Sequence, residues 1–238
     1  MESNVLFEDQ DYLILCKQEY RPVQGDKSGD LSYLDELKGQ GRIDPGGGLV
    51  HRLDRPVLGV LIFAKNRQSL AAFNKLLRER KVEKIYWAVT EKPPPEPEGE
   101  VIDQLGRDGR RNRSYRAAPC EREEGQSSGK TKTAVLRYRL LGKTLRYWRL
   151  EIRPLTGRSH QIRVQLAGMG CPIKGDLKYG AARSKPGGGI YLFSRSAAFV
   201  HPRTGETIRV QAPLPQDPLW AAFETPQTPE AGREKPCV

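Results

Sequence analysis

The feature that most constrains the fold is a long succession of short apolar segments with the character of β-strands. They lie at residues 5–7, 12–15, 60–64, 82–90, 134–141, 145–152, 190–193, 197–200 and 208–211. These segments are rich in branched and aromatic residues, and turn-forming residues separate them. Helical patterns are fewer, so strands and helices do not alternate one to one. The pattern therefore predicts an α+β fold rather than repeated βαβ units.

Local signals predict how some of these segments pair or end. Residues 5–7 and 12–15 are separated by a polar turn and are expected to pair as a hairpin. Residues 31–37 read as a short helix, and Asn66 can cap a longer one that runs to about residue 80. The last strands, 197–200 and 208–211, are expected to pair with each other.

The strand at residues 82–90 alternates between its two faces, which places Tyr86 and Trp87 on opposite sides. Taken alone, Tyr86 is either a core tyrosine or a functional phenol. The alternation by itself does not choose between these roles.

One carboxylate lies between two arginines in the segment His51-Arg52-Leu53-Asp54-Arg55. The apolar run at residues 60–64 follows Gly59 and predicts a buried strand, so Asp54 should lie in a loop that leads into the core. An aspartate beside arginines usually forms a solvated surface ion pair. A functional carboxylate is the alternative.

A second informative segment, residues 150–170, predicts a strand, a turn and a helix. Ser159 is a candidate N-cap, and Gly170 ends the helical pattern. Arg158 falls in the turn and Arg163 in the first or second helical turn. Both guanidinium groups could face one anion, or they could belong to a basic helix face in water.

Taken together, these motifs resemble the RluA-type family of pseudouridine synthases. The matching segments are His51 to Arg55 with Gly59, Lys84 to Ala88, Gly157 to Val164, Pro172 to Asp176 with Tyr179 and Gly180, His201 to Glu206, and Ala212 to Pro215. They span roughly residues 3 to 220. Their order and spacing make the resemblance far more specific than any one motif.

The chain departs from the family pattern at three places. Lys17-Gln18-Glu19-Tyr20 stands where the family often has Lys-Pro-x-Gly, Leu58 replaces a small hydroxyl residue, and Gln165 replaces a frequent histidine. None of these changes removes a group that the family uses for catalysis. We interpret them as variation within the family.

The resemblance implies a role for each matched polar residue. Asp54 is the catalytic carboxylate, Arg163 pairs with it, and Tyr86 stacks on the uracil and assists removal of the C5 proton. Arg52 inserts into the gap that a flipped uridine leaves, and Arg55 and Arg158 hold phosphates or neighbouring backbone. The sequence leaves open whether Asp54 attacks the sugar, attacks the base or abstracts a proton from the sugar.

The resemblance also implies the pseudouridine synthase fold, in which a largely antiparallel or mixed central sheet forms two half-domains with a catalytic cleft between them. We expect residues 1–222 to form this catalytic domain and residues 223–238 to be a disordered tail. No small N-terminal RNA-binding module of the S4 type is expected before it.

The chain carries a formal net charge of +11, which suits a polyanionic partner such as RNA. Five arginines lie within residues 106–116, the best candidate for a mobile arm that contacts RNA, although a plain solubilising loop is the alternative. Its predicted RNA-binding residues are Arg107, Arg110, Arg111 and Arg113.

Other classes of protein are not supported by the composition. A long apolar run and a signal-peptide pattern are both absent, so we expect a cytoplasmic protein without a membrane partner. The four cysteines are scattered and predict neither disulfides nor a metal site. We expect no cofactor and no protein partner, and a monomer is the simplest state.

The predicted function is isomerisation of specific uridines to pseudouridine in ribosomal or transfer RNA. A non-catalytic RNA-binding protein on the same fold would explain the charge, but not an aspartate between arginines. A glycoside hydrolase would need a second carboxyl group, and none accompanies Asp54 in the sequence.

Overall fold

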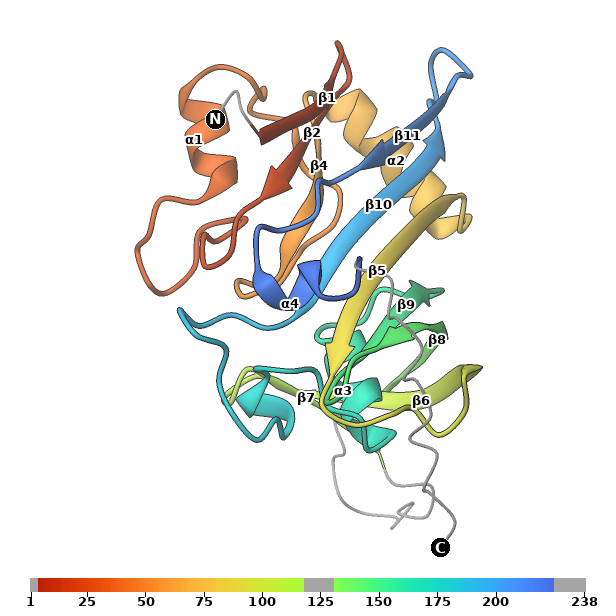
Figure 1. The fold of residues 1–238 in the computed structure, drawn as a ribbon. Coiled ribbons are helices and arrows are strands. Elements are labelled where there is room, and N and C mark those ends of the chain that lie inside the picture. The colour runs from red at the N-terminus through yellow and green to blue at the C-terminus, as the bar shows by residue number, and fades with distance from the viewer. Residues whose placement is uncertain (1–3, 118–130, 225–238) are drawn as a thin grey trace, which may run out of the picture.

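The computed structural model describes residues 4–117 and 131–224, and it is built around one long, twisted sheet (Figure 1). The helices are few and short, as the sequence predicts. Residues 225–238, most of the predicted disordered tail, lie outside the described residues. Within the described part, no helix is long and apolar enough to cross a membrane.

Eleven strands form this sheet, in the order β1-β2-β4-β10-β5-β9-β8-β6-β7, with β3 paired to β4 and β11 paired to β10. The strands are β1 (Val5–Glu8), β2 (Tyr12–Lys17), β3 (Gly48–Leu49), β4 (Leu58–Ala64), β5 (Val82–Thr90), β6 (Glu98–Asp108), β7 (Arg113–Arg116), β8 (Lys132–Lys143), β9 (Trp148–Pro154), β10 (Leu192–Val200) and β11 (Thr207–Gln211). The helices are α1 (Tyr33–Gly39), α2 (Arg67–Arg78), α3 (Gln161–Gly168) and α4 (Pro218–Ala221), with a 3₁₀ turn at Leu177–Tyr179.

The sheet has two halves that meet at its middle strands. In Figure 1, β1, β2, β4, α1 and α2 lie in the upper half, and β6 to β9 with α3 lie in the lower half. All neighbouring strands are antiparallel except β4 and β10, which are parallel. The mixed sheet and its two halves agree with the predicted α+β fold.

Gly59 allows the backbones of β4 and β10 to approach closely. Its φ is +111°, and a Cβ atom there would lie 2.2 Å from the carbonyl oxygen of Ser194. Only glycine can occupy this position without moving a strand. The β4 strand can therefore pair with β10 directly after the loop that carries Asp54.

Several predicted elements are present. The β1–β2 hairpin and the β10–β11 pair form as expected, and Asn66 caps α2 in a reciprocal arrangement with Ser69. Residues 190–193 and 197–200 are not separate strands, because residues 192–193 and 197–200 belong to the continuous strand β10.

Two local predictions were wrong. His160, not Ser159, is the N-cap of α3, and its backbone is in the left-handed region with φ +52°. Residues 106–116 form most of the β6–β7 hairpin instead of a mobile arm. The hairpin is anchored by Ser114, whose hydroxyl donates to the Ser159 carbonyl at 2.7 Å.

The core is one large apolar cluster that extends through both halves of the sheet. Leu61, Ile62 and Phe63 of β4 are fully buried, as are Leu150 and Ile152 of β9. A smaller cluster lies under the β6–β7 hairpin and includes Val164 of α3 and Tyr179. The second cluster fixes α3 against the hairpin, and α3 carries Arg163.

Candidate active site

A cleft of about 1170 Å³ lies between the two halves of the sheet. One wall is formed by the loop at residues 50–57, and the opposite wall by residues 154–163. Its lining brings together seven of the predicted site residues: Asp54, Tyr86, Arg163, Arg52, Arg55, Arg158 and Arg107. Arg110, Arg111 and Arg113 do not line it.

Lys17, the last residue of β2, holds the loop that carries Asp54 through hydrogen bonds to its backbone. This lysine is completely buried, and its Nζ donates to the carbonyls of Gln18, Arg55 and Val57 at 2.8–2.9 Å. The backbone N–H of Val57 also donates to the Asp54 carbonyl at 3.0 Å. The position of Asp54 therefore depends on the end of β2 as well as on β4.

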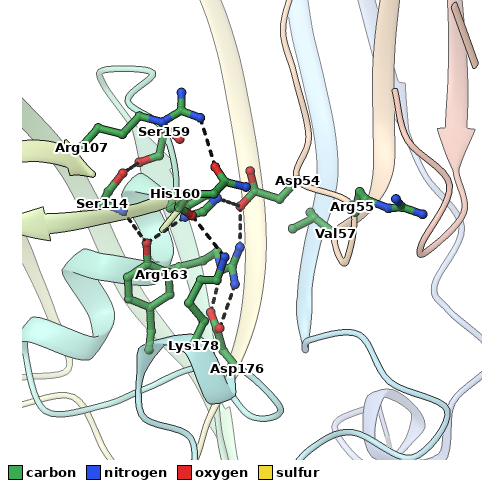
Figure 2. A network of polar contacts seen from close by, with 12 residues as sticks. Asp54, Arg55, Val57, Arg107, Ser114, Ser159, His160, Arg163, Asp176 and Lys178 are labelled. Carbon is green, nitrogen blue, oxygen red and sulfur yellow. Dashed lines mark hydrogen bonds and ion pairs between the residues drawn. The ribbon is translucent and has the colours of Figure 1, made fainter. Parts of the chain in front are cut away.

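Arg163 forms the electrostatic centre of the site (Figure 2). Its Nε and Nη2 donate to the two carboxylate oxygens of Asp176 at 2.7 and 2.8 Å, and its Nη1 donates to Asp54 Oδ2 at 2.9 Å. Burial lowers the pKa of Arg163, but the two carboxylates outweigh burial and hold that pKa above its ordinary value. The guanidinium is thus a fixed positive charge that links the two walls of the cleft.

His160 lies beside this ion pair and is joined to the hairpin through Tyr179. The Tyr179 hydroxyl is 2.7 Å from His160 Nδ1 and accepts a hydrogen bond from the Ser114 backbone N–H at 2.9 Å. His160 Nε2 lies 3.7 Å from Asp54 Oδ2. Burial lowers the pKa of His160 below its usual value.

Tyr86 lies on the cleft side of β5, where β5 is paired with both β9 and β10. Its side chain is only 7% exposed, and burial raises its pKa to about 12. The phenol is therefore protonated near neutral pH and can donate a hydrogen bond. Its position on a strand fixed from both sides suits it to form one face of a base-binding slot.

The predicted RNA-binding arginines fall into different environments. Arg52 is exposed at the cleft, and Arg158 Nε donates to the Thr133 carbonyl at 2.9 Å. Arg107 contacts Asn112 Oδ1 at 3.1 Å within the hairpin (Figure 2). Arg55 lies at the rim, but its guanidinium forms ion pairs with Asp26 and Asp30.

The remaining hairpin arginines are directed elsewhere. The backbone N–H groups of Arg110 and Arg111 donate to the Asp108 side chain in the turn. Arg113 lies over the Tyr179 ring, 5.3 Å from its centre. Of the four hairpin arginines that were predicted to bind RNA, the structure thus brings only Arg107 to the cleft.

Sequence analysis predicts no role for Asp176, Tyr179, His160 or Lys84, which all belong to the site or lie close to it. Asp176 is 1% exposed, and a buried charge needs a partner, but its burial depends on contacts that sequence spacing does not reveal. Lys84 lies two residues before Tyr86, so strand alternation alone would have placed both on one face. The alternation expected for residues 82–90 thus places Lys84 with Tyr86, but it indicates no role for Lys84.

The arrangement provides a carboxylate with a fixed counter-charge, a neutral histidine and a protonated phenol in one cleft. Such a set can position and stabilise a reacting group without a second carboxyl group at the reacting centre, because Asp176 is fully occupied by Arg163. Cationic side chains around the opening favour a polyanionic substrate.

Comparison with known proteins identifies the family of the chain. Residues 11–168 match the family model described as RNA pseudouridylate synthase. An uncharacterised RNA pseudouridine synthase of Bacillus subtilis is 30% identical over 226 residues, which cover 91% of this chain and 71% of that protein. A ribosomal large subunit pseudouridine synthase D of Xanthomonas campestris is 32% identical, with 90% of this chain and 66% of that protein covered. This chain therefore spans about two thirds of the length of these relatives.

The fold also matches a solved structure. The human RNA pseudouridylate synthase domain containing 1 superposes with a TM-score of 0.72 at 24% identity, covering 92% of this chain and 86% of that chain. At this identity the match concerns the fold, and it supports the prediction made from the strand pattern.

Proposed function

The chain belongs to the RNA pseudouridylate synthase family, and we propose that it isomerises uridine to pseudouridine in ribosomal or transfer RNA with Asp54 as the catalytic carboxylate. Asp54, Tyr86 and Arg163 line one cleft although they are far apart in the sequence. The observation that carries the proposal is the 2.9 Å contact between Arg163 and Asp54, which supports an ionised carboxylate where a substrate can reach it.

The reaction conserves every atom of the substrate. The bond between N1 and C1′ breaks, the uracil turns within the site, and C5 forms the new bond to C1′. The proton leaves C5, and N1 carries a proton in the product. Attack on the sugar, attack on the base and proton abstraction from the sugar all require an ionised carboxylate beside the nucleoside, which is the role proposed for Asp54.

The other residues act on the base and on the RNA. Tyr86 stacks on the uracil, and its neutral hydroxyl assists departure of the C5 proton to solvent by hydrogen bonding. Arg52 occupies the place of the flipped uridine, whose unstacking costs roughly a few kcal/mol. Arg158 and Arg107 contact phosphates. The compartment expected for such a substrate is the cytoplasm, and a monomer remains the expected state.

The proposal is tested with total RNA labelled with tritium at uridine C5, taken from a strain that lacks this protein. Wild type should release tritium, and Asp54→Asn should reduce the rate by roughly 10⁴-fold or more while RNA affinity stays within a few-fold. Asp44→Asn, at an exposed aspartate before β3, is the control and should match wild type.

Two results would contradict the proposal. Tritium release by Asp54→Asn at the wild-type rate would remove Asp54 from catalysis. Salt-sensitive RNA binding without release by wild type would favour an RNA-binding protein that has kept the fold of an enzyme.

A further inference from the structure

The two oxygens of the Asp54 carboxylate have different surroundings. Arg163 Nη1 at 2.9 Å and His160 Nε2 at 3.7 Å both approach Oδ2. Across residues 4–117 and 131–224, the hydrogen bond and the ion pairs of this carboxylate are all made by Oδ2 and none by Oδ1. The protein thus holds the carboxylate by one oxygen and leaves the other free.

A chain of hydrogen bonds fixes which nitrogen of His160 carries the proton. The Ser114 N–H donates to the Tyr179 oxygen, so this oxygen already accepts one hydrogen bond. Among the described residues, His160 Nδ1 is the only acceptor for the Tyr179 hydroxyl hydrogen. Nδ1 therefore accepts, and the proton of the neutral ring lies on Nε2, which faces Asp54.

Burial and the charges of Arg163 and Lys178 favour this neutral form of His160, whereas the charges of Asp54 and Asp176 oppose it. Burial has the largest effect and lowers the pKa of the ring. His160 is therefore an N–H donor without a charge of its own.

The backbone of His160 also indicates a constraint on this position. Its φ of +52° lies in the left-handed region, and its side chain makes no capping hydrogen bond to α3. A residue held in this conformation without a capping role is typical of functional sites. The conformation directs the ring towards Asp54 instead of the helix end.

From these observations we propose that His160 is a positioning residue for Asp54: the Ser114–Tyr179–His160 chain directs Nε2–H at Oδ2, and together with Arg163 it leaves Oδ1 to act on the uridine. This inference rests on the proposed function for the identity of the reaction. The hydrogen-bond chain itself can be tested without any turnover.

The first test is ¹⁵N NMR of histidine-labelled protein. In wild type, His160 should show a protonated Nε2 and an unprotonated Nδ1 between pH 7 and 8. Tyr179→Phe removes the hydroxyl that donates to Nδ1 and should shift the ring towards a mixture of tautomers. Tyr115→Phe, at an exposed tyrosine of the same hairpin, is the control and should leave the His160 signals unchanged.

The second test compares kinetic constants with labelled RNA. Tyr179→Phe should lower kcat about 10- to 100-fold, the range seen when the group that orients a reacting residue is lost, with little change in KM. Two replacements of His160 separate the effect of side-chain length from the effect of the left-handed backbone conformation. His160→Asn tolerates the left-handed conformation but cannot reach Asp54, whereas His160→Gln can present an N–H near the Nε2 position and should recover part of kcat.

The outcomes are distinguishable from failure of the proposed function. A wild-type ring with its proton on Nδ1 would overturn the inference even if the protein is active. Unchanged kcat in both Tyr179→Phe and His160→Asn would do the same. If wild type releases no tritium, the proposed reaction fails, and an Nε2 proton that responds to Tyr179→Phe would still support the positioning chain.

Discussion

The two walls of the cleft differ in how their polar groups are paired. On the wall formed by α3 and the β6–β7 hairpin, Arg163, Asp176 and Tyr179 all have partners within the protein. On the wall formed by the Asp54 loop, α2 and β5, Asp54 and Arg55 are paired, but Arg52 and Lys84 also line the cleft. Within the described chain neither of these two side chains has a hydrogen-bond or ion-pair partner. The first wall is organised before substrate arrives, whereas the second carries two cations that a ligand can pair.

This difference separates two tasks. A fully paired network holds reacting groups in place and loses little when the substrate binds. Unpaired cations gain most when a phosphate reaches them, so they contribute to affinity. Changes to the first wall should therefore affect stability and turnover, and changes to the second should affect RNA affinity.

The largest expected effect comes from breaking the paired wall with Arg163→Met. The substitution leaves the buried Asp176 carboxylate without a counter-charge, which typically costs about 3–5 kcal/mol. The free energy of unfolding, measured with urea, should fall by that amount, and turnover should be lost. Arg158→Met, at an exposed arginine, is the control and should change stability by less than about 0.5 kcal/mol. Normal stability with normal turnover would show that the contacts of Arg163 with Asp176 and Asp54 are dispensable.

The second effect is a loss of stability at acid pH. It depends on His51, which lies in the Asp54-loop wall. Burial, followed by the charge of Lys84, lowers the pKa of His51 from 6.5 to about 3. Between these values the unfolded chain binds a proton that the folded chain does not, so stability falls as the pH falls from 6.5 towards 3.

This contribution has a slope of about 1.4 kcal/mol per pH unit. His51→Gln keeps an acceptor for the Ile62 N–H, which donates to His51 Nε2 at 3.3 Å, and it removes the titration. The free energy of unfolding should be measured at several pH values for both proteins. Its slope against pH should be shallower in the variant by up to this amount. Parallel curves for the two proteins would contradict the assignment of a neutral His51.

The smallest effect should come from the unpaired wall. Lys84→Met removes one cation and should reduce the slope of log affinity against log salt by about 0.7–0.9 for one lost phosphate contact. Turnover at saturating RNA should change little. Lys81→Met is the matched control, because Lys81 is exposed and paired with Glu79. An equal loss of slope in both variants would mean that Lys84 adds only to the overall charge.

The sequence predicted more of the Asp54-loop wall than of the wall opposite. The Asp54 loop, the strand after it and the Asn66 cap follow from local signals that act over a few residues. Family resemblance supplied Arg163 and Tyr86. Their predicted roles stay predictions, although both residues do line the cleft with Asp54.

The missing part of the prediction depended on contacts between distant segments. Asp176 lies in an ordinary polar loop by sequence, and only the fold buries it against Arg163. Ser159 looks like a cap by its type, but the chain turns through a left-handed His160 first. The many arginines of residues 106–116 predict a mobile arm because they mask the alternation of a strand. The contact that anchors this hairpin, from Ser114 to Ser159, joins segments far apart in the sequence.

The pairing of β5, the strand that carries Tyr86 and Lys84, has a mechanical consequence. From Tyr86 to Ala88, β5 is hydrogen-bonded to β9 on one side and to β10 on the other, so the two halves of the molecule share one sheet. A hinge at this point would have to break the sheet that carries Tyr86. We therefore expect the two halves to move little relative to each other when RNA binds. The conformational change on binding should take place in the RNA. Target sites in which a uridine leaves its stack at low cost should therefore be modified fastest.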